Sequence, residues 1–155
     1  MKNQIEVGDT VEDFELLDET GASRKLSELL GEGPVVLFFY PAALSAGCTA
    51  EACHFRDLAA EFTAAGGRPV GISGDTVERQ QAFAGKHTLG YPLLSDPEGL
   101  IREQFGVKRG FSLAPTKRVT FVISEDRKVL EVVRSEFKMS AHADRALAAL
   151  RAHKG

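Results

Sequence analysis

The sequence lacks the features that mark membrane, secreted and nucleic-acid-binding proteins. No apolar run approaches the roughly 18 residues needed to cross a bilayer, and residues 1–7 lack the apolar core of a signal peptide. The formal net charge is −3, and neither a basic cluster nor an acidic tail is present. We therefore expect a cytoplasmic protein that has no membrane and no nucleic acid among its partners.

Motifs for cofactors and metals are also missing. There is no glycine-rich nucleotide fingerprint of the G-x-G-x-x-G type. The four histidines are scattered, and together with two cysteines five residues apart they give no recognisable zinc spacing. The sequence therefore implies no cofactor and no bound metal. The histidines are His54, His87, His142 and His153.

Cysteine is scarce, and the two that occur are close together, at Cys48 and Cys53. In a cytosolic protein such a pair is more often catalytic than structural. The spacing is not the C-x-x-C of a thioredoxin-type reductase. On a regular helix it puts the two Cα atoms about 8.7 Å apart, whereas a disulfide usually needs less than about 6.8 Å. A bond between the two sulfurs therefore requires the helix to unwind locally.

The two cysteines follow a predicted buried strand. Residues 34–40 are continuously apolar, as expected for a central strand covered on both faces. Pro41 ends this strand, small residues follow, and a helix is predicted from Ala46. Cys48 then lies in the first helical turn, where unpaired N–H groups and the positive end of the helix dipole favour a thiolate over a thiol. We expect Cys48 to be a nucleophile.

The rest of the chain alternates between predicted strands and helices. Strands are predicted at residues 14–17, 68–73, 91–94, 117–123 and 128–134. Helices are predicted at residues 27–31, 46–65, 76–87, 97–105 and 141–153. Such an alternation, ending in a hairpin and a helix, predicts one α/β domain over residues 1–155, with a central mixed sheet flanked by helices. The thioredoxin-like fold is the natural candidate.

Helix caps support several of these boundaries. Ser27, Thr76 and Ser140 are each placed to cap the helix that follows them. Leu147 and Leu150 are expected on the inner side of the last helix.

The residues around the two cysteines resemble the active-site signature of peroxiredoxins. The matching pattern is Phe39-Tyr40-Pro41-x-x-x-Ser45-x-Gly47-Cys48-Thr49-x-Glu51-Ala52-Cys53-x-Phe55-Arg56-Asp57. It is most similar to the bacterioferritin comigratory protein, or peroxiredoxin Q, subfamily. Further blocks match in order along nearly the whole chain, at residues 8–9, 14–16, 70–75, 83–106 and 118–123. The resemblance implies the thioredoxin-like fold as well.

This resemblance also implies roles for individual residues. Cys48 would be the peroxidatic cysteine, which attacks the O–O bond of a peroxide. Cys53 would resolve the resulting sulfenic acid as an intramolecular disulfide. Arg118 would reach across to the thiolate and stabilise the charge that develops on oxygen. Pro41 would cover the thiolate and shield it from water.

Ser45 stands where the family normally has threonine. It keeps the hydroxyl that would hydrogen-bond the thiolate and the peroxide, and it is also placed to cap the helix. Ala46 replaces the proline common in the subfamily, so the turn should unwind more easily. Glu51 suits the helix dipole, but a lone carboxylate would oppose a nearby thiolate. We therefore hypothesise that Glu51 pairs with Arg118.

The sequence as a whole indicates a thiol-dependent peroxidase for hydrogen peroxide and organic hydroperoxides. The resemblance implies thioredoxin, or a similar dithiol protein, as the reductant, and the protein would be a monomer or a weak homodimer. One alternative is a non-catalytic redox sensor or chaperone that uses the same cysteine switch. Another is a general disulfide oxidoreductase. Against it, the C-x-x-C is missing, and Val119 stands where proteins resembling thioredoxin carry a cis-proline.

Overall fold

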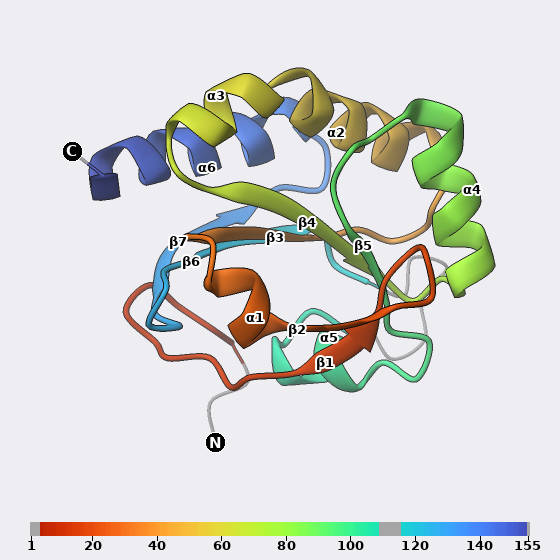
Figure 1. Ribbon diagram of the computed structural model, residues 1–155, viewed down its shortest axis with the longest axis horizontal. Helices are drawn as coiled ribbons and strands as arrows, with labels where there is room; N and C mark the ends of the chain where they lie inside the picture. Colours follow the sequence, from red (N-terminus) through yellow and green to blue (C-terminus); the bar gives the residue numbers. More distant parts are fainter. Residues whose placement is uncertain (1–3, 109–115, 155) are drawn as a thin grey trace.

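The computed structural model describes residues 4–108 and 116–154. Its centre is a seven-stranded sheet with the strand order β2-β1-β5-β4-β3-β6-β7 (Figure 1). The strands are β1 (Glu15–Leu17), β2 (Ser23–Lys25), β3 (Val35–Phe39), β4 (Arg68–Ser73), β5 (Leu93–Ser95), β6 (Val119–Ile123) and β7 (Val129–Arg134). The helices are α1 (Leu26–Leu30), α2 (Ala46–Asp57), α3 (Ala59–Ala64), α4 (Val77–His87), α5 (Leu100–Gln104) and α6 (Met139–Lys154).

The sheet is mixed, as predicted. Strands β3, β4 and β5 run parallel to one another, while β6, β7 and the β1–β2 hairpin pair antiparallel with their neighbours. Helices α2, α3 and α6 cover one face of the sheet, and α1 and α5 lie on the other (Figure 1). This arrangement confirms the predicted α/β fold.

Strand β3 supplies both halves of the hydrophobic core. All five of its residues are buried, and alternate side chains of a strand point to opposite faces. Its odd-numbered residues join a cluster with α1 and α5, and its even-numbered residues join a cluster with α2, α3, α4 and α6. This explains why the run at 34–40 is apolar without alternation.

Two contacts attach α2 to the sheet. The rings of Phe55 in α2 and Phe38 in β3 stack with centroids 4.3 Å apart, a geometry that adds about 0.5–1.5 kcal/mol beyond burial. The Tyr91 hydroxyl donates to the Ala52 carbonyl oxygen at 2.7 Å. These contacts hold the helix that carries both cysteines.

The helix predicted over residues 46–65 is two helices, α2 and α3, separated at Leu58. The Leu58 backbone (φ −97°, ψ 15°) leaves the helical region, and its N–H is shared between the carbonyl oxygens of His54 and Phe55. Neither glycine nor proline marks the break, which is why the sequence pattern did not show it.

Two of the predicted caps are wrong. Helix α1 begins at Leu26 after Lys25, and the Ser27 backbone N–H and hydroxyl instead donate to the Asp13 carboxylate. The distant carboxylate outcompetes the local cap. Ser140 lies inside α6, which begins at Met139. By contrast, Thr76 caps α4 as predicted and accepts a 3.3 Å bond from the Arg79 N–H.

Other boundaries differ from the predictions by short stretches. Strand β5 begins later than predicted, and α5 is a single short helix. Strand β2 was not predicted, because it is short and polar and forms only by pairing with β1. No helix in the described residues is long and apolar enough to cross a membrane. Residues 1–3, part of the N-terminal stretch considered above, lie outside the described residues.

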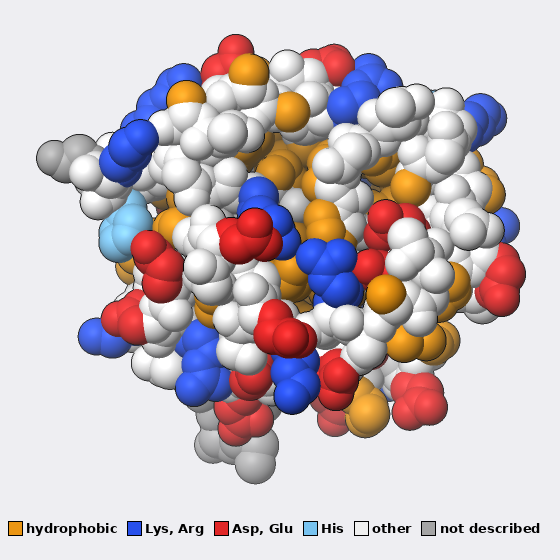
Figure 2. All heavy atoms as spheres, viewed as in Figure 1, with side chains coloured by type: hydrophobic (Ala, Val, Ile, Leu, Met, Phe, Trp, Pro, Cys, Tyr) orange, Lys and Arg blue, Asp and Glu red, His pale blue; other side chains and the backbone are white. Residues whose placement is uncertain are grey.

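Charged side chains of both signs are interspersed over the face shown in Figure 2. Hydrophobic side chains gather in a hollow near the middle of that view.

Candidate active site

Cys48 lies in the first turn of α2, as predicted. A short loop connects the end of β3 to the helix, whose first backbone bond runs from the Thr49 N–H to the Ser45 carbonyl oxygen at 2.8 Å. The cysteine is buried (1% exposed). The strand and the helix dipole therefore present one sulfur at a fixed place beneath the surface.

Arg118 reaches this sulfur from a distant part of the chain. Its Nη2 donates to Cys48 Sγ at 3.4 Å. The sheet explains the approach: β6 runs antiparallel to β3, with Val119 opposite Phe39. Arg118 therefore lies beside the end of β3, where the cysteine loop begins. The predicted contact between Arg118 and Cys48 is present.

Glu51 completes a buried triad with these two residues. It lies three residues after Cys48, on the same side of α2, and is fully buried (0% exposed). Arg118 Nη1 donates to Glu51 Oε1 at 2.6 Å. The hypothesised Glu51–Arg118 pair is thus present, and one guanidinium bridges a sulfur and a carboxylate one helical turn apart.

The triad is strongly coupled electrostatically. Burial raises the pKa of Glu51 to about 7, although Arg118 acts in the opposite direction. Burial would lower the pKa of Arg118, but the charges of Glu51 and Cys48 outweigh this effect and raise it above its usual value. Arg118 therefore stays charged at any working pH.

Gly47 permits the close approach of the guanidinium. A Cβ atom at this position would lie 3.3 Å from Arg118 Nη2 and 3.3 Å from Met139 Cε. Both distances are tighter than most contacts of a real side chain. Glycine therefore leaves the space that the guanidinium occupies beside Cys48.

Pro41 and Ser45 lie in the loop before α2. Ser45 occupies the N-cap position, but its hydroxyl makes no capping bond and instead donates to the Ala42 carbonyl oxygen at 2.9 Å. Pro41 is half-buried. Within the described part of the chain, no hydrogen bond joins either residue to Cys48. Their predicted roles toward the thiolate and the peroxide stay predictions.

Cys53 is half-buried in the same intact helix, and both cysteines are free thiols. The hydrogen bond to Asp57 raises the pKa of Arg56, one turn further along, and the electrostatic effect of Cys53 acts in the same direction. Resolution by Cys53 stays a prediction, because the helix must unwind for the bond to form.

A second ion pair fixes the cysteine loop and was missed from the sequence. Asp75 Oδ2 accepts from the Ala43 N–H at 2.7 Å, and Arg79 Nη2 donates to the Ala43 carbonyl oxygen at 3.1 Å. The two side chains also pair with each other at 3.1 Å. The backbone N–H and C=O of one loop residue, Ala43, are therefore both held, one from the turn before α4 and the other from α4 itself.

His142 was also missed. It is fully buried (0% exposed) on the apolar side of α6, with Nδ1 3.5 Å from Glu51 Oε2. Burial lowers its pKa, against the opposing effect of its hydrogen bond to Ser135. The helical period could have found it, because His142 lies eight residues before the inward-facing Leu150.

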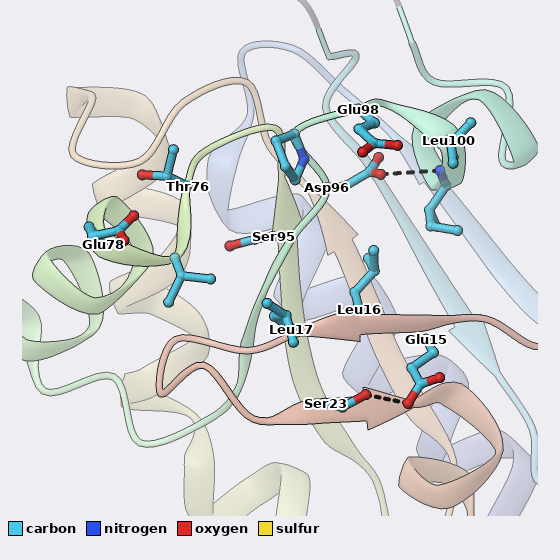
Figure 3. A pocket seen from close by; sticks show the side chains of 13 residues that line it. Glu15, Leu16, Leu17, Ser23, Thr76, Glu78, Ser95, Asp96, Glu98 and Leu100 are labelled. Atoms are coloured by element: carbon cyan, nitrogen blue, oxygen red, sulfur yellow. Dashed lines mark hydrogen bonds between the residues drawn. The ribbon is translucent and has the colours of Figure 1, made fainter.

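A pocket of about 490 Å³ lies elsewhere, between the β1–β2 hairpin and the starts of α4 and α5 (Figure 3). Leu16 and Leu17 line it on the hairpin side, and Glu78 and Glu98 lie around it. Cys48, Glu51 and Arg118 are not among its lining residues. Its lining offers apolar surface, hydroxyls and carboxylates but neither a cysteine nor a guanidinium, so its volume does not locate the reactive site.

The chemistry of the Cys48 site follows from its atoms. A sulfur beside a guanidinium and a helix N-terminus is stabilised as an anion, and an anionic sulfur is a nucleophile toward electrophilic oxygen or sulfur. Among the described residues, no group of His, Cys, Asp or Glu side chains is arranged to hold a metal ion. The fold and the site together define a thiol-based redox protein of the thioredoxin-like class.

Comparisons with known proteins make this class specific. The model of the AhpC/TSA family matches residues 7–132. A putative peroxiredoxin of Mycobacterium tuberculosis is 61% identical over 150 residues, covering 96% of this chain and 97% of that protein. Peroxiredoxin Bcp of Escherichia coli is 37% identical over 156 residues, covering 97% and 99%.

Solved structures agree. The crystal structure of peroxidoxin BcpB from Mycobacterium tuberculosis has a TM-score of 0.93 and 61% identity, covering 96% of this chain and 98% of that one. A bacterioferritin comigratory protein of Xanthomonas campestris, studied for its alkyl peroxide reduction activity, has a TM-score of 0.84 and 30% identity, covering 95% and 100%. The chain belongs to the AhpC/TSA family, among the peroxiredoxins of the bacterioferritin comigratory protein and peroxiredoxin Q type.

Proposed function

We propose that this peroxiredoxin reduces hydrogen peroxide and organic hydroperoxides through Cys48, forms a disulfide with Cys53, and is recycled by thioredoxin or a similar dithiol protein. The observation that carries the proposal is the 3.4 Å contact between Arg118 Nη2 and Cys48 Sγ. The alkyl peroxide reduction associated with the Xanthomonas relative supports the substrate class.

In the first step the Cys48 thiolate attacks the terminal oxygen of the peroxide. A sulfur–oxygen bond forms and the O–O bond breaks, so sulfur is oxidised to a sulfenic acid and the leaving oxygen takes up a proton as water or an alcohol. Arg118 stabilises the negative charge as it passes from sulfur to the leaving oxygen. The Ser45 hydroxyl would hydrogen-bond the peroxide, and Pro41 would keep water away from the sulfur.

In the second step the Cys53 sulfur attacks the Cys48 sulfenic acid, which forms a disulfide and releases water. The intact helix holds the two Cα atoms about 8.7 Å apart, so the first turns of α2 must unwind. Unwinding costs the Phe38–Phe55 stack and the Tyr91–Ala52 bond. The break at Leu58 limits how far the unwinding must spread.

In the third step a dithiol protein reduces the disulfide by thiol–disulfide exchange, which returns both cysteines to thiols. The unwound segment would expose the disulfide to this partner. We expect the protein to work in the cytoplasm as a monomer or a weak homodimer.

The test is a thioredoxin-coupled peroxidase assay on the parent, Cys48→Ser and Cys53→Ser proteins. We expect no activity from Cys48→Ser. Cys53→Ser should consume one equivalent of peroxide and then stall unless a small thiol is added. Full turnover by Cys48→Ser would overturn the assignment. A parent protein that is oxidised once and never recycled would instead favour the redox-sensor alternative.

A further inference from the structure

The Glu51 carboxylate is satisfied at only one of its two oxygens. Oε1 accepts the bond from Arg118, while Oε2 is buried without a hydrogen-bond partner. A buried polar atom without a partner is costly and calls for an explanation. The imidazole Nδ1 of His142 lies 3.5 Å from Oε2, and both side chains are fully buried (0% exposed).

The hydrogen bonds of His142 fix which ring nitrogen carries the hydrogen. Nε2 lies 2.8 Å from the Ser135 carbonyl oxygen, and because a carbonyl only accepts, Nε2 is the donor. Nδ1 of the neutral ring is then an acceptor, and the Thr120 hydroxyl donates to it at 2.7 Å. Nδ1 therefore has no hydrogen of its own to give to Glu51 Oε2.

Two acceptors that face each other in a buried site repel unless a proton lies between them. Either the Glu51 carboxyl carries this proton on Oε2, or the His142 ring carries it on Nδ1, with Thr120 Oγ1 at 2.7 Å and Glu51 Oε2 at 3.5 Å as the facing acceptors. In both cases the pair holds one proton and titrates as a unit.

This proton matters for Cys48 because Arg118 has one positive charge and two acidic neighbours. Its guanidinium contacts Cys48 Sγ at 3.4 Å and Glu51 Oε1 at 2.6 Å. With a thiolate, a carboxylate and a neutral imidazole, the buried cluster has one uncompensated negative charge, which is costly. With one proton on the Glu51–His142 pair, the cluster is neutral while Cys48 is a thiolate.

We propose that His142 is a positioning residue for the reaction of Cys48. It shares one proton with Glu51, so that the positive charge of Arg118 compensates the Cys48 thiolate and not the Glu51 carboxylate. His142 acts through Glu51 and Arg118 and not on the sulfur itself. The kinetic consequence rests on the proposed peroxidase function, whereas the shared proton does not.

The surrounding charges agree with this assignment. Burial raises the pKa of Glu51 to about 7 and lowers the pKa of His142, and both shifts favour the carboxyl as the place of the proton. Glu136 favours protonation of both groups, and Arg118 opposes it at both. The charged and titratable groups that act on the pair or feel its charge are Cys48, Tyr91, Arg118, Glu136 and Arg145.

The shared proton can be observed without any peroxide. In ¹⁵N-labelled protein, the ring nitrogens of His142 report the tautomer and its change with pH. We expect the Nε2–H tautomer, and an Nδ1 resonance that titrates near pH 7, the value for Glu51. This titration should disappear in Glu51→Gln, whose amide cannot lose a proton. An Nδ1 resonance that titrates identically in Glu51→Gln would overturn the proposal.

The kinetic test is the rate of Cys48 oxidation by peroxide as a function of pH. The parent rate should decline as the pair loses its proton. In His142→Asn the side-chain amide donates toward Oε2 and stabilises the carboxylate. The pH at which the rate declines should therefore be lower by about one unit. His153→Asn, the same change at an exposed position of the same helix, should leave the profile in place.

The outcomes separate the two proposals. A folded His142→Asn protein with the parent pH profile would overturn the role of His142. If His142→Asn does not fold, the nitrogen titration of the parent and Glu51→Gln proteins decides. If the parent shows no peroxidase activity, the proposed function fails, and the nitrogen titration still supports or overturns the shared proton.

Discussion

Two arginines of this protein are equally buried but differently satisfied. Arg102 and Arg118 are each 5% exposed. Arg102 donates from Nε to Asp96 Oδ2 at 3.2 Å, from Nη2 to the Asp96 carbonyl oxygen at 2.8 Å and from Nη1 to Thr116 Oγ1 at 3.2 Å. Asp96 also accepts from the backbone N–H groups of Ile101 and Arg102.

The guanidinium nitrogens of Arg118 have different partners from those of Arg102. Its Nε is buried without a partner. Its Nη2 donates to the Cys48 sulfur, and its Nη1 donates to the Glu51 carboxylate, whose second oxygen has no hydrogen bond. A saturated ion pair fixes structure, whereas unsatisfied buried groups gather where a protein performs chemistry. The difference separates a structural arginine from one that has the same burial and that we propose to act in the reaction of Cys48.

The largest effect we expect is on stability, from Arg102→Met. The change removes the guanidinium and leaves the Asp96 carboxylate buried and unpaired, so the free energy of unfolding should fall by about 3–5 kcal/mol. Urea unfolding monitored by circular dichroism measures this loss. The peroxidase rate of the remaining folded protein should match the parent. A peroxidase rate of the folded Arg102→Met protein that is also well below the parent rate would contradict the contrast between the two arginines.

The matched change, Arg118→Met, should act mainly on rate. Loss of the donor that stabilises charge in the transition state should slow Cys48 oxidation by about 10²–10³-fold. At pH 6 the destabilisation should be smaller than for Arg102→Met, because the Glu51 carboxyl, whose pKa is about 7, is then protonated. Rapid-quench alkylation with mass spectrometry measures the rate; the chain has no tryptophan to report it by fluorescence. A nearly normal rate would make Arg118 a second structural arginine.

A smaller effect concerns the pH dependence of stability. Burial raises the pKa of Glu51 from 4.5 to about 7. The stability associated with its neutral form is therefore complete below pH 4.5 and is lost as the pH rises through 7. The lowered pKa of His142 acts in the opposite sense, because its contribution is lost as the pH falls below 6.5.

Glu51→Gln isolates the first of these contributions. Between pH 4.5 and pH 8, the free energy of unfolding of the variant should rise by roughly 3 kcal/mol relative to that of the parent, because the amide stays neutral throughout. Urea unfolding of both proteins at the two pH values measures the gain. A difference between the two proteins that does not change with pH would show that the carboxyl is not held neutral by burial.

The sequence predicted the parts of this molecule that follow from local pattern. The continuous apolar run at 34–40 identified the central strand, and Thr76 identified the start of α4. The same sequence pattern predicted that both cysteines lie on one helix. It did not predict strand β2, because three polar residues form a strand only when β1 lies beside them.

The site was predictable only in part, because its contacts join segments far apart in the chain. The sequence pattern places Arg118 only at the start of a predicted strand, and only the family resemblance directed it toward Cys48, 70 residues away. The role of Glu51 followed from a charge argument, since a thiolate and a carboxylate need a common cation. The approach of His142 to Glu51 depends on how α6 packs against α2, which no local pattern encodes.

The central claim is that the guanidinium of Arg118 holds the Cys48 sulfur as a reactive anion. The most direct measurement is the rate of alkylation of Cys48 by iodoacetamide, an uncharged reagent, at one neutral pH in the Cys53→Ser protein with and without Arg118→Met. We predict that loss of the guanidinium slows alkylation by at least tenfold, in line with the 3.4 Å contact in the structure. Equal rates in the two proteins would contradict the account.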